Sequence, residues 1–204
     1  MTSSATRVGQ GEGGAPPAGG RKTVGRAGGL RWLTRAAVLL ALAIAFQSLR
    51  LGQAVTGPAV NAILLTAGVV IGPWGGAAIG LLTPVTAFFL GVLKPVLAPA
   101  IPFIMLGNAV LVLIFAYGRR MNVYLAIIAA AAAKYLLLSA AVVYIISLPG
   151  PVSVALRLPQ LFTALGGGLV ALVILEALAA GGVVSRADWP GLGLGARRKE
   201  AGER

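Results

Sequence analysis

The segment from Thr56 to Phe115 contains one charged side chain, Lys94, and is interrupted repeatedly by glycine and proline. A segment this long and this poor in charge is too apolar to be the core of a small soluble domain. A helix needs roughly 20 apolar residues to cross a bilayer, and it satisfies its own backbone hydrogen bonds in lipid. We therefore expect several membrane-spanning helices, joined by short turns at the glycine and proline positions.

The whole chain has a membrane composition, because 58% of its 204 residues are hydrophobic and its mean hydropathy is +0.91. It contains no Cys and no His, which excludes disulfides, thiolate or imidazole metal sites and His-dependent nucleophiles. Of its acidic residues only Glu176 lies within an apolar segment. Catalysis by paired carboxylates has no residues to use, so we expect neither an enzyme nor a cofactor-binding chain.

Three parts are expected along the chain. Residues 1–30 and 185–204 are interpreted as disordered basic tails, since they are rich in glycine and basic residues and lack an apolar period. Residues 31–184 are expected to form an all-α membrane domain, a bundle of six transmembrane helices. Turn signals at Thr56–Pro58, Gly72-Pro73 and Pro149-Gly150-Pro151 separate some of these helices. The helices are expected over residues 33–49, 59–71, 75–93, 101–117, 122–148 and 158–181.

The orientation follows from the basic residues, because Lys and Arg concentrate in the cytoplasmic loops of membrane proteins. With the N-terminus inside, thirteen of the seventeen Lys and Arg fall on the inner side, and both termini are cytoplasmic. The outer ends receive Arg50, Lys94 and Arg157, and Lys134 lies within the fifth helix. The net charge of +12 then reflects topology and contact with anionic lipid, and no nucleic-acid partner is expected. A signal peptide cleaved after Ala43-Ile44-Ala45 is the disfavoured alternative, because its basic n-region would be unusually long.

Most polar side chains near the apolar segments are expected in the outer half of the bundle. Polar groups in lipid are costly and face the bundle interior or a water-filled cavity, so an outward-opening binding pocket is expected. Two of these residues also have a structural interpretation: Asn108 could join two helices, and Ser139 could bond the preceding turn of its own helix. The expected substrate-binding residues are Asn61, Asn108, Lys134, Ser139 and Gln160.

A lysine in the middle of a membrane helix needs a partner, and two remain open for Lys134. One is an anionic ligand or a water-filled cavity. The other is Glu176, which by helical rise lies roughly 9 Å nearer the inside. Arg50, Lys94 and Arg157 have no acidic neighbour on the outer side. Each alone is typical of a solvated loop end, but together they favour a negatively charged or carboxylate-bearing ligand.

Small residues mark two places where helices can approach closely. Ala37, Ala41 and Ala45 recur every fourth residue and form a flat stripe on the first helix, although alanine is abundant throughout the chain. The run Gly166-Gly167-Gly168 in the sixth helix predicts close helix contact or a flexible point. Glycine costs about 1 kcal/mol against alanine in a helix, so three together need a packing reason.

Three short motifs, in their order and spacing, resemble the substrate-binding S components of energy-coupling factor (ECF) transporters, which are small membrane subunits of prokaryotic vitamin importers. The resemblance covers about residues 31–184 and includes the size, the six-helix pattern and the alanine stripe. The motifs are Thr56-Gly57-Pro58-Ala59-Val60-Asn61, Gly80-Leu81-Leu82-Thr83-Pro84 and Pro102-Phe103-Ile104-Met105-Leu106-Gly107-Asn108.

This resemblance implies a subunit of the prokaryotic cell membrane that binds a vitamin or related small molecule from outside. Such subunits have no ATPase, and a membrane coupling (T) subunit and two cytoplasmic ATPase subunits use ATP to drive uptake. It implies that Ala37, Ala41 and Ala45 dock the coupling subunit. It also implies that the first outer loop, with Gln53, Thr56 and Gly57, is the lid over the pocket. The aromatic-rich pocket motifs associated with thiamine or riboflavin members are missing, so the substrate stays open.

Three other functions are weighed against this one. A stand-alone secondary carrier would use Lys134 and Glu176 as a proton-coupled pair, but no internal repeat is visible. A membrane enzyme would pair Ser139 with Lys134, but residues five apart on a helix point to different faces. A scaffold without a ligand would leave the outer polar residues without a role.

Overall fold

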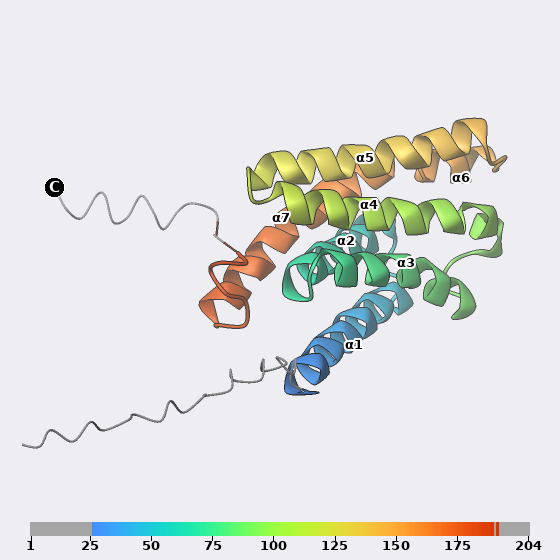
Figure 1. Ribbon diagram of the computed structural model, residues 1–204. Helices are drawn as coiled ribbons and strands as arrows, with labels where there is room; N and C mark the ends of the chain where they lie inside the picture. The colour runs from blue at the N-terminus through green and yellow to red at the C-terminus, as the bar shows by residue number, and fades with distance from the viewer. Residues whose placement is uncertain (1–25, 190, 192–204) are drawn as a thin grey trace, which may run out of the picture.

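The computed structural model describes residues 26–189 and Gly191, and within this part of the chain it contains helices and no strands. Two short helices, η1 (Pro95–Ala100, a 3₁₀ helix) and α6 (Gly150–Ala155), accompany six long ones (Figure 1). The expected all-α bundle of six long helices is therefore confirmed. The long helices are α1 (Arg26–Ser48), α2 (Gln53–Val70), α3 (Pro73–Phe89), α4 (Ile101–Gly118), α5 (Val123–Tyr144) and α7 (Leu158–Ala180).

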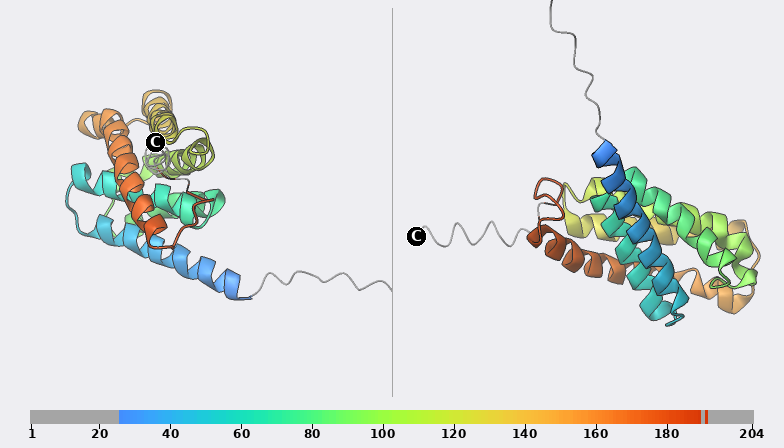
Figure 2. Two further views of the ribbon diagram at one scale, coloured as in Figure 1. Left: turned by 90° about the vertical axis from the view of Figure 1, so that its left-hand side faces the viewer. Right: turned by 90° about the horizontal axis from the view of Figure 1, so that it is seen from below.

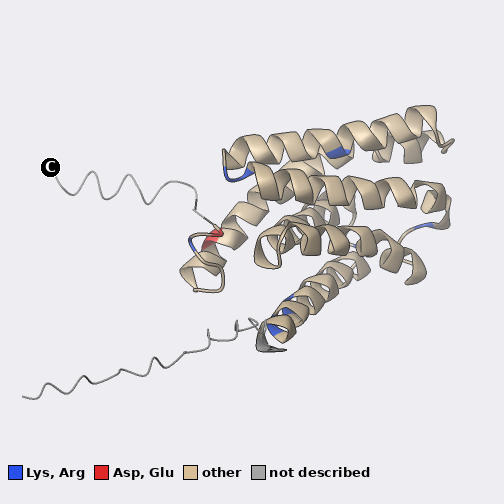
Figure 3. Cartoon of the chain, viewed as in Figure 1, with Lys and Arg blue, Asp and Glu red and all other residues tan. Residues whose placement is uncertain are grey.

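The bundle has the dimensions and composition of a multi-pass membrane protein. Five helical segments are long and apolar enough to cross a membrane, and α3 is a shorter apolar helix of 17 residues. At 1.5 Å per residue α3 is about 25 Å long, slightly less than the hydrocarbon core of a bilayer. Figure 3 shows few charged residues along the helices of the bundle.

Helix α2 is central, because it packs against α1, α3, α4 and α7. Helix α4 packs against α3 and α5, while α1 crosses the bundle obliquely over α2 and α3 (Figures 1 and 2). Leu65, Phe115 and Leu175 form part of the main apolar core between α2, α4, α5 and α7. Helices α2 and α3 touch through their backbones, since a Cβ on Gly76 would lie 2.5 Å from the backbone nitrogen of Gly68.

Local signals explain where several helices begin. Helix α2 follows Gly52 (φ 80°) and α3 follows Gly72 (φ 90°), and glycine adopts such positive φ angles without steric cost. Pro73 occupies the first position of α3, where a missing N–H costs nothing. Asn122 caps α5, because its Oδ1 accepts hydrogen bonds of 3.0 Å from the backbone N–H groups two and three residues later.

Four expected helix ends were wrong. Helix α1 begins at Arg26 rather than residue 33, and the other three ends lie together at the opposite end of the bundle. Helix α2 begins at Gln53 rather than residue 59, because the helix continues through Pro58 and the turn lies at residues 49–52. Membrane helices tolerate an internal proline when neighbouring helices and side chains satisfy the freed groups. Helix α3 ends at Phe89 rather than 93, where Gly91 turns the chain with φ 67°. Helix α5 ends at Tyr144 rather than 148, and Pro149 follows.

Residues 182–189, which we name the C-terminal hook, fold back onto the ends of α4 and α7. Trp189 is 1% exposed and belongs to the main core, and its indole Nε1 donates a 2.9 Å hydrogen bond to Glu176. Arg186 Nη1 lies 3.0 Å from the other oxygen of Glu176. Arg119, at the end of α4, donates to the backbone carbonyl of Asp188.

The hook shows that the folded domain extends to Trp189, past the boundary that was expected at residue 184. Residues 26–30, expected in the N-terminal tail, belong to α1. The other residues of the two expected tails, 1–25, 190 and 192–204, lie outside the described residues.

Candidate functional site

Three polar side chains meet inside the bundle, each from a different helix. Lys134 of α5 is 3% exposed, and its Nζ donates hydrogen bonds of 2.8 Å to Oδ1 of Asn61 on α2 and to Oδ1 of Asn108 on α4. Both asparagines are themselves buried, at 3% and 4% exposed. We call these three residues the Lys–Asn cluster.

A fourth helix joins the cluster through Asn108. Its Nδ2 donates a 3.1 Å hydrogen bond to the backbone carbonyl of Gly80 on α3. The Nδ2 of Asn108 therefore bonds α3, and its Oδ1 accepts from Lys134. This arrangement fixes the orientation of the amide, with its nitrogen toward Gly80 and its oxygen toward the lysine.

Glycines make the close approach of these helices possible. A Cβ on Gly167 of α7 would lie 2.5 Å from the Cβ of Asn61, and a Cβ on Gly80 would lie 3.1 Å from the Cβ of Asn108. A Cβ on Gly107 would lie 3.3 Å from Cγ of Lys134. The close contact expected for the glycine run of the sixth helix is thus confirmed at Gly167, and also at Gly168, where a Cβ would lie 2.4 Å from Ile127.

A cavity of about 700 Å³ runs from the Lys–Asn cluster to one end of the bundle. Lys134 precedes Tyr144, the last residue of α5, by ten residues, which corresponds to about 15 Å of helix. The other walls come from the α1–α2 turn, the beginning of α2, the segment 91–97, α6 and the beginning of α7. We call this the site end of the bundle, and the end with residues 119–122 and the hook is called the hook end.

The described residues that line the cavity include cations and no carboxylate. Arg50, Lys94 and Lys134 contribute to its lining, whereas Glu176 and Asp188, the two carboxylates of the described residues, lie at the hook end. Charges near a low-dielectric wall act more strongly than charges in bulk water. The lining therefore favours a negatively charged group.

The α1–α2 turn holds Arg50 in an unusual backbone conformation at the edge of the cavity. Arg50 is the non-glycine residue with positive φ (50°) in the described part of the chain, a region that bulky side chains seldom adopt. Its Nη2 donates a 3.1 Å hydrogen bond to the carbonyl of Gly91. This bond joins two of the segments that surround the mouth of the cavity.

One hydroxyl on the cavity wall has no partner. Oγ1 of Thr56 is buried and makes no hydrogen bond with the described residues, although Thr56 lines the cavity. Thr83 also lines the cavity, but its Oγ1 is occupied, because it donates a 2.6 Å bond to the carbonyl of Ile79. A buried donor without a partner is costly unless something in the cavity accepts from it.

The structure brings together four of the five expected binding residues. Asn61, Asn108, Lys134 and Gln160 line the cavity. Ser139 does not: it lies outside the lining, and its buried Oγ makes no hydrogen bond with the described residues, so the expected bond within its own helix is not formed. Thr86, on α3, makes such a bond, because its Oγ1 donates to carbonyls of the preceding turn of its own helix.

The expected lid residues lie at the cavity, but they are not in a loop. Gln53, Thr56 and Gly57 line the cavity from the first two turns of α2. Residues 91–97 and α6 line the cavity at the same end, and neither segment was expected to do so. The signal was present in the Pro149-Gly150-Pro151 cluster, which begins a short helix as well as ending the previous segment.

The alternative pairing of Lys134 with Glu176 was wrong. Glu176 bonds Arg186 and Trp189 of the hook, while Lys134 bonds two asparagines near the middle of the bundle. A proton-coupled carrier based on this pair has no support, and neither has an enzyme that pairs Ser139 with Lys134.

The alanine stripe lies on the outside of the bundle. Ala37, Ala41 and Ala45 are exposed on α1, whereas Ala43 is 0% exposed and faces the other helices. The stripe is therefore free to contact another membrane protein or lipid.

A helical membrane bundle with an internal, cation-lined cavity that reaches one end is the architecture of a membrane protein that binds a small solute. The family model described as the substrate-specific component of ECF transporters matches residues 31–185, and the chain belongs to this family. No curated protein and no solved structure matches the chain in the corresponding searches.

Proposed function

We propose that this protein is the substrate-capture (S) subunit of an ECF-type ABC importer, and that it binds a vitamin or a related small molecule from outside the cell. The observation that carries the proposal is the cavity between the Lys–Asn cluster and the site end. A membrane coupling subunit and two cytoplasmic ATPase subunits would supply the energy from ATP, since this chain offers no nucleotide-binding motif of its own.

The distribution of basic residues supports an orientation in which the site end faces outside and both termini lie in the cytoplasm of a prokaryotic cell. The hook end would then also contact the anionic lipids of the inner leaflet. Among the described residues near the two ends, Arg50, Lys94 and Arg157 lie at the site end, and Arg31, Arg35, Arg119, Arg120 and Arg186 lie at the hook end.

This orientation can be tested directly because the chain contains no cysteine. Lys94→Cys and Arg120→Cys introduce single thiols at exposed positions on opposite ends. A membrane-impermeant maleimide added to intact cells should label the first variant and leave the second unlabelled until the cells are opened. The reverse pattern would contradict the orientation.

The alanine stripe of α1 is proposed as the surface that docks the coupling subunit. Small side chains allow two helices to approach closely, and the three alanines of the stripe are exposed and do not line the cavity. Ala41→Trp should therefore abolish uptake and leave solute binding intact. Leu136→Trp is the matched control, because Leu136 is 63% exposed on α5, away from α1. Normal uptake by Ala41→Trp would overturn the docking assignment.

A further inference from the structure

We propose that the substrate is a small aliphatic carboxylate, with its carboxylate held at Lys134 and Asn61. This inference rests on the proposed function, since it names the class of molecule that the same cavity takes. It is carried by three features of the lining: an ammonium group without a counter-ion, amide and hydroxyl donors without acceptors, and the absence of aromatic side chains from the lining residues.

The charge of Lys134 is not balanced by the protein. Its two partners are neutral amide oxygens, and the described residues place no carboxylate in the cavity lining. A buried charge without an opposite charge is expensive, and the cost is relieved when an anion enters. An ammonium also has three N–H donors, and the two asparagines accept from only two of them. The third is available to a ligand.

Asn61 supplies a second donor at the same place. Its Oδ1 accepts from Lys134, while its Nδ2 donates no hydrogen bond to the described residues. Asn108 differs, because its Nδ2 is already bound to the carbonyl of Gly80. A carboxylate has two oxygens that only accept hydrogen bonds. One oxygen can accept from Lys134 Nζ and the other from Asn61 Nδ2, which is the bidentate arrangement that discriminates a carboxylate from a neutral group.

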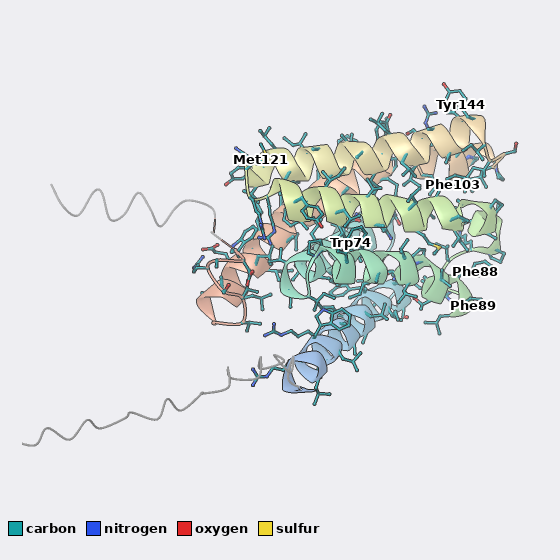
Figure 4. The ribbon with its side chains drawn as sticks, in the orientation of Figure 1. Trp74, Phe88, Phe89, Phe103, Met121 and Tyr144 are labelled. Carbon is teal, nitrogen blue, oxygen red and sulfur yellow. The ribbon has the colours of Figure 1, made fainter. Side chains whose placement is uncertain are left out.

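The rest of the cavity suits an aliphatic chain. Val60, Pro84, Ile104 and Val152 are among its apolar lining residues, and no Phe, Tyr or Trp of the described part of the chain lines it. Aromatic side chains lie elsewhere: Phe89 is 81% exposed and Tyr144 is 84% exposed, both at the site end but pointing away from the bundle (Figure 4). A flat ring would find no aromatic face for stacking, whereas a saturated chain would fill the space between branched aliphatic groups.

Neutral polar groups line the cavity between the Lys–Asn cluster and the site end. The unpaired hydroxyl of Thr56 and the amide side chains of Gln53 and Gln160 line the cavity nearer the site end. They can bond a hydroxyl or amide group on the ligand, some distance from its carboxylate. The complete class is then an aliphatic acid that carries one further neutral polar group.

The experiment uses the full-length protein in lipid nanodiscs and a panel of simple probes, with the shift in unfolding temperature measured against probe concentration. The probes are 6-hydroxyhexanoate, hexane-1,6-diol, which lacks the charge, and 4-hydroxyphenylacetate, which replaces the chain by a ring. We expect 6-hydroxyhexanoate to bind most tightly of the three. Binding of the diol as tightly as the acid would overturn the carboxylate assignment, and tighter binding of the aromatic acid would overturn the aliphatic one. No shift with any probe would overturn both.

One lysine variant and a control at the other end of the bundle locate the carboxylate. Lys134→Met keeps the length of the side chain and removes the charge, and we expect affinity for 6-hydroxyhexanoate to fall about ten- to a hundredfold. Arg120→Met also removes one positive charge, but at an exposed position of the hook end that does not line the cavity, and it should have little effect. Unchanged affinity in Lys134→Met would overturn the site. If that variant does not fold, the ranking of the three probes by the unchanged protein decides the class.

Failure of this inference can be distinguished from failure of the proposed function. Co-purification with a coupling subunit and ATPases, together with a preference for the diol or the aromatic acid, would support the proposed function and contradict the proposed substrate class. A preference for 6-hydroxyhexanoate without any associated energising subunit would support the proposed substrate class and contradict the proposed function.

Discussion

At the hook end of the bundle both described carboxylates have partners, whereas at the site end cationic side chains line a cavity without any carboxylate. Glu176 bonds Arg186 and Trp189, and Asp188 accepts a 2.6 Å hydrogen bond from Ser185. Lys134, by contrast, has only neutral partners, and the nearby hydroxyl of Thr56 has none among the described residues. The carboxylates of the hook end are therefore paired within the protein, while the cations that line the cavity at the site end have no carboxylate beside them among the described residues.

The largest effect on stability is expected at the hook end. Trp189→Ala removes a side chain that is 1% exposed, and it should lower the free energy of unfolding by about 3–5 kcal/mol. The affinity for 6-hydroxyhexanoate should not change, because Trp189 does not line the cavity. Trp74→Ala is the matched control, since Trp74 is 72% exposed (Figure 4). Chemical unfolding in detergent measures the stability of both variants. An equal loss of unfolding free energy in the two variants would show that the buried Trp189 does not stabilise the fold more than an exposed tryptophan.

The next effect should appear in binding at the site end. Asn108→Ala removes an acceptor from Lys134 and the bond to Gly80, so we expect binding to weaken by about 1–3 kcal/mol, together with a loss of thermal stability. Isothermal titration measures the dissociation constant of 6-hydroxyhexanoate. An unchanged constant with reduced stability would show that Asn108 only joins helices.

A third test concerns the helix contact that holds Asn61 in place. In Gly167→Ala the new Cβ would lie 2.5 Å from the Cβ of Asn61, so α2 and α7 must move apart, at a cost of about 1–3 kcal/mol. Gly166→Ala is the control, because its Cβ would lie 3.6 Å from Pro58, an ordinary contact distance. Gly167→Ala should unfold at a clearly lower temperature than Gly166→Ala. Similar unfolding temperatures would show that the close approach at Gly167 does not contribute to stability.

The smallest effect is expected from the ion pair of the hook. Glu176→Gln removes the charge that faces Arg186, but these side chains are 40% and 55% exposed, so the loss should be about 0–1 kcal/mol. Unfolding at low and high salt measures it. A larger loss than that of Asn108→Ala would reverse the comparison between the two ends.

The sequence predicts the bundle well because its main determinants are local. Long apolar segments and the breakers between them are sufficient to indicate six long helices. The position of the first outer turn is less predictable, because Gly57-Pro58 resembles a stronger breaker than Gly52. In the structure Pro58 lies within α2, and the positive φ of Gly52 marks the turn.

The candidate site was predictable in its residues but not in its contacts. Lys134, Asn61 and Asn108 stand out because polar groups are rare in these helices. Which of them meet depends on how closely the helices approach, and this is decided by glycines such as Gly167 that are far away along the chain. The same reasoning explains the wrong partner for Lys134, since the hook that binds Glu176 was expected to be part of a tail.

The most direct test of the whole account is a gentle affinity purification of the tagged protein from its native membranes, with proteins and small molecules identified by mass spectrometry in the same sample. The account predicts a second membrane subunit, two ATPase subunits and an enriched small aliphatic acid. A protein that emerges alone from several mild detergents, with neither ATPase subunits nor an enriched metabolite, would contradict it.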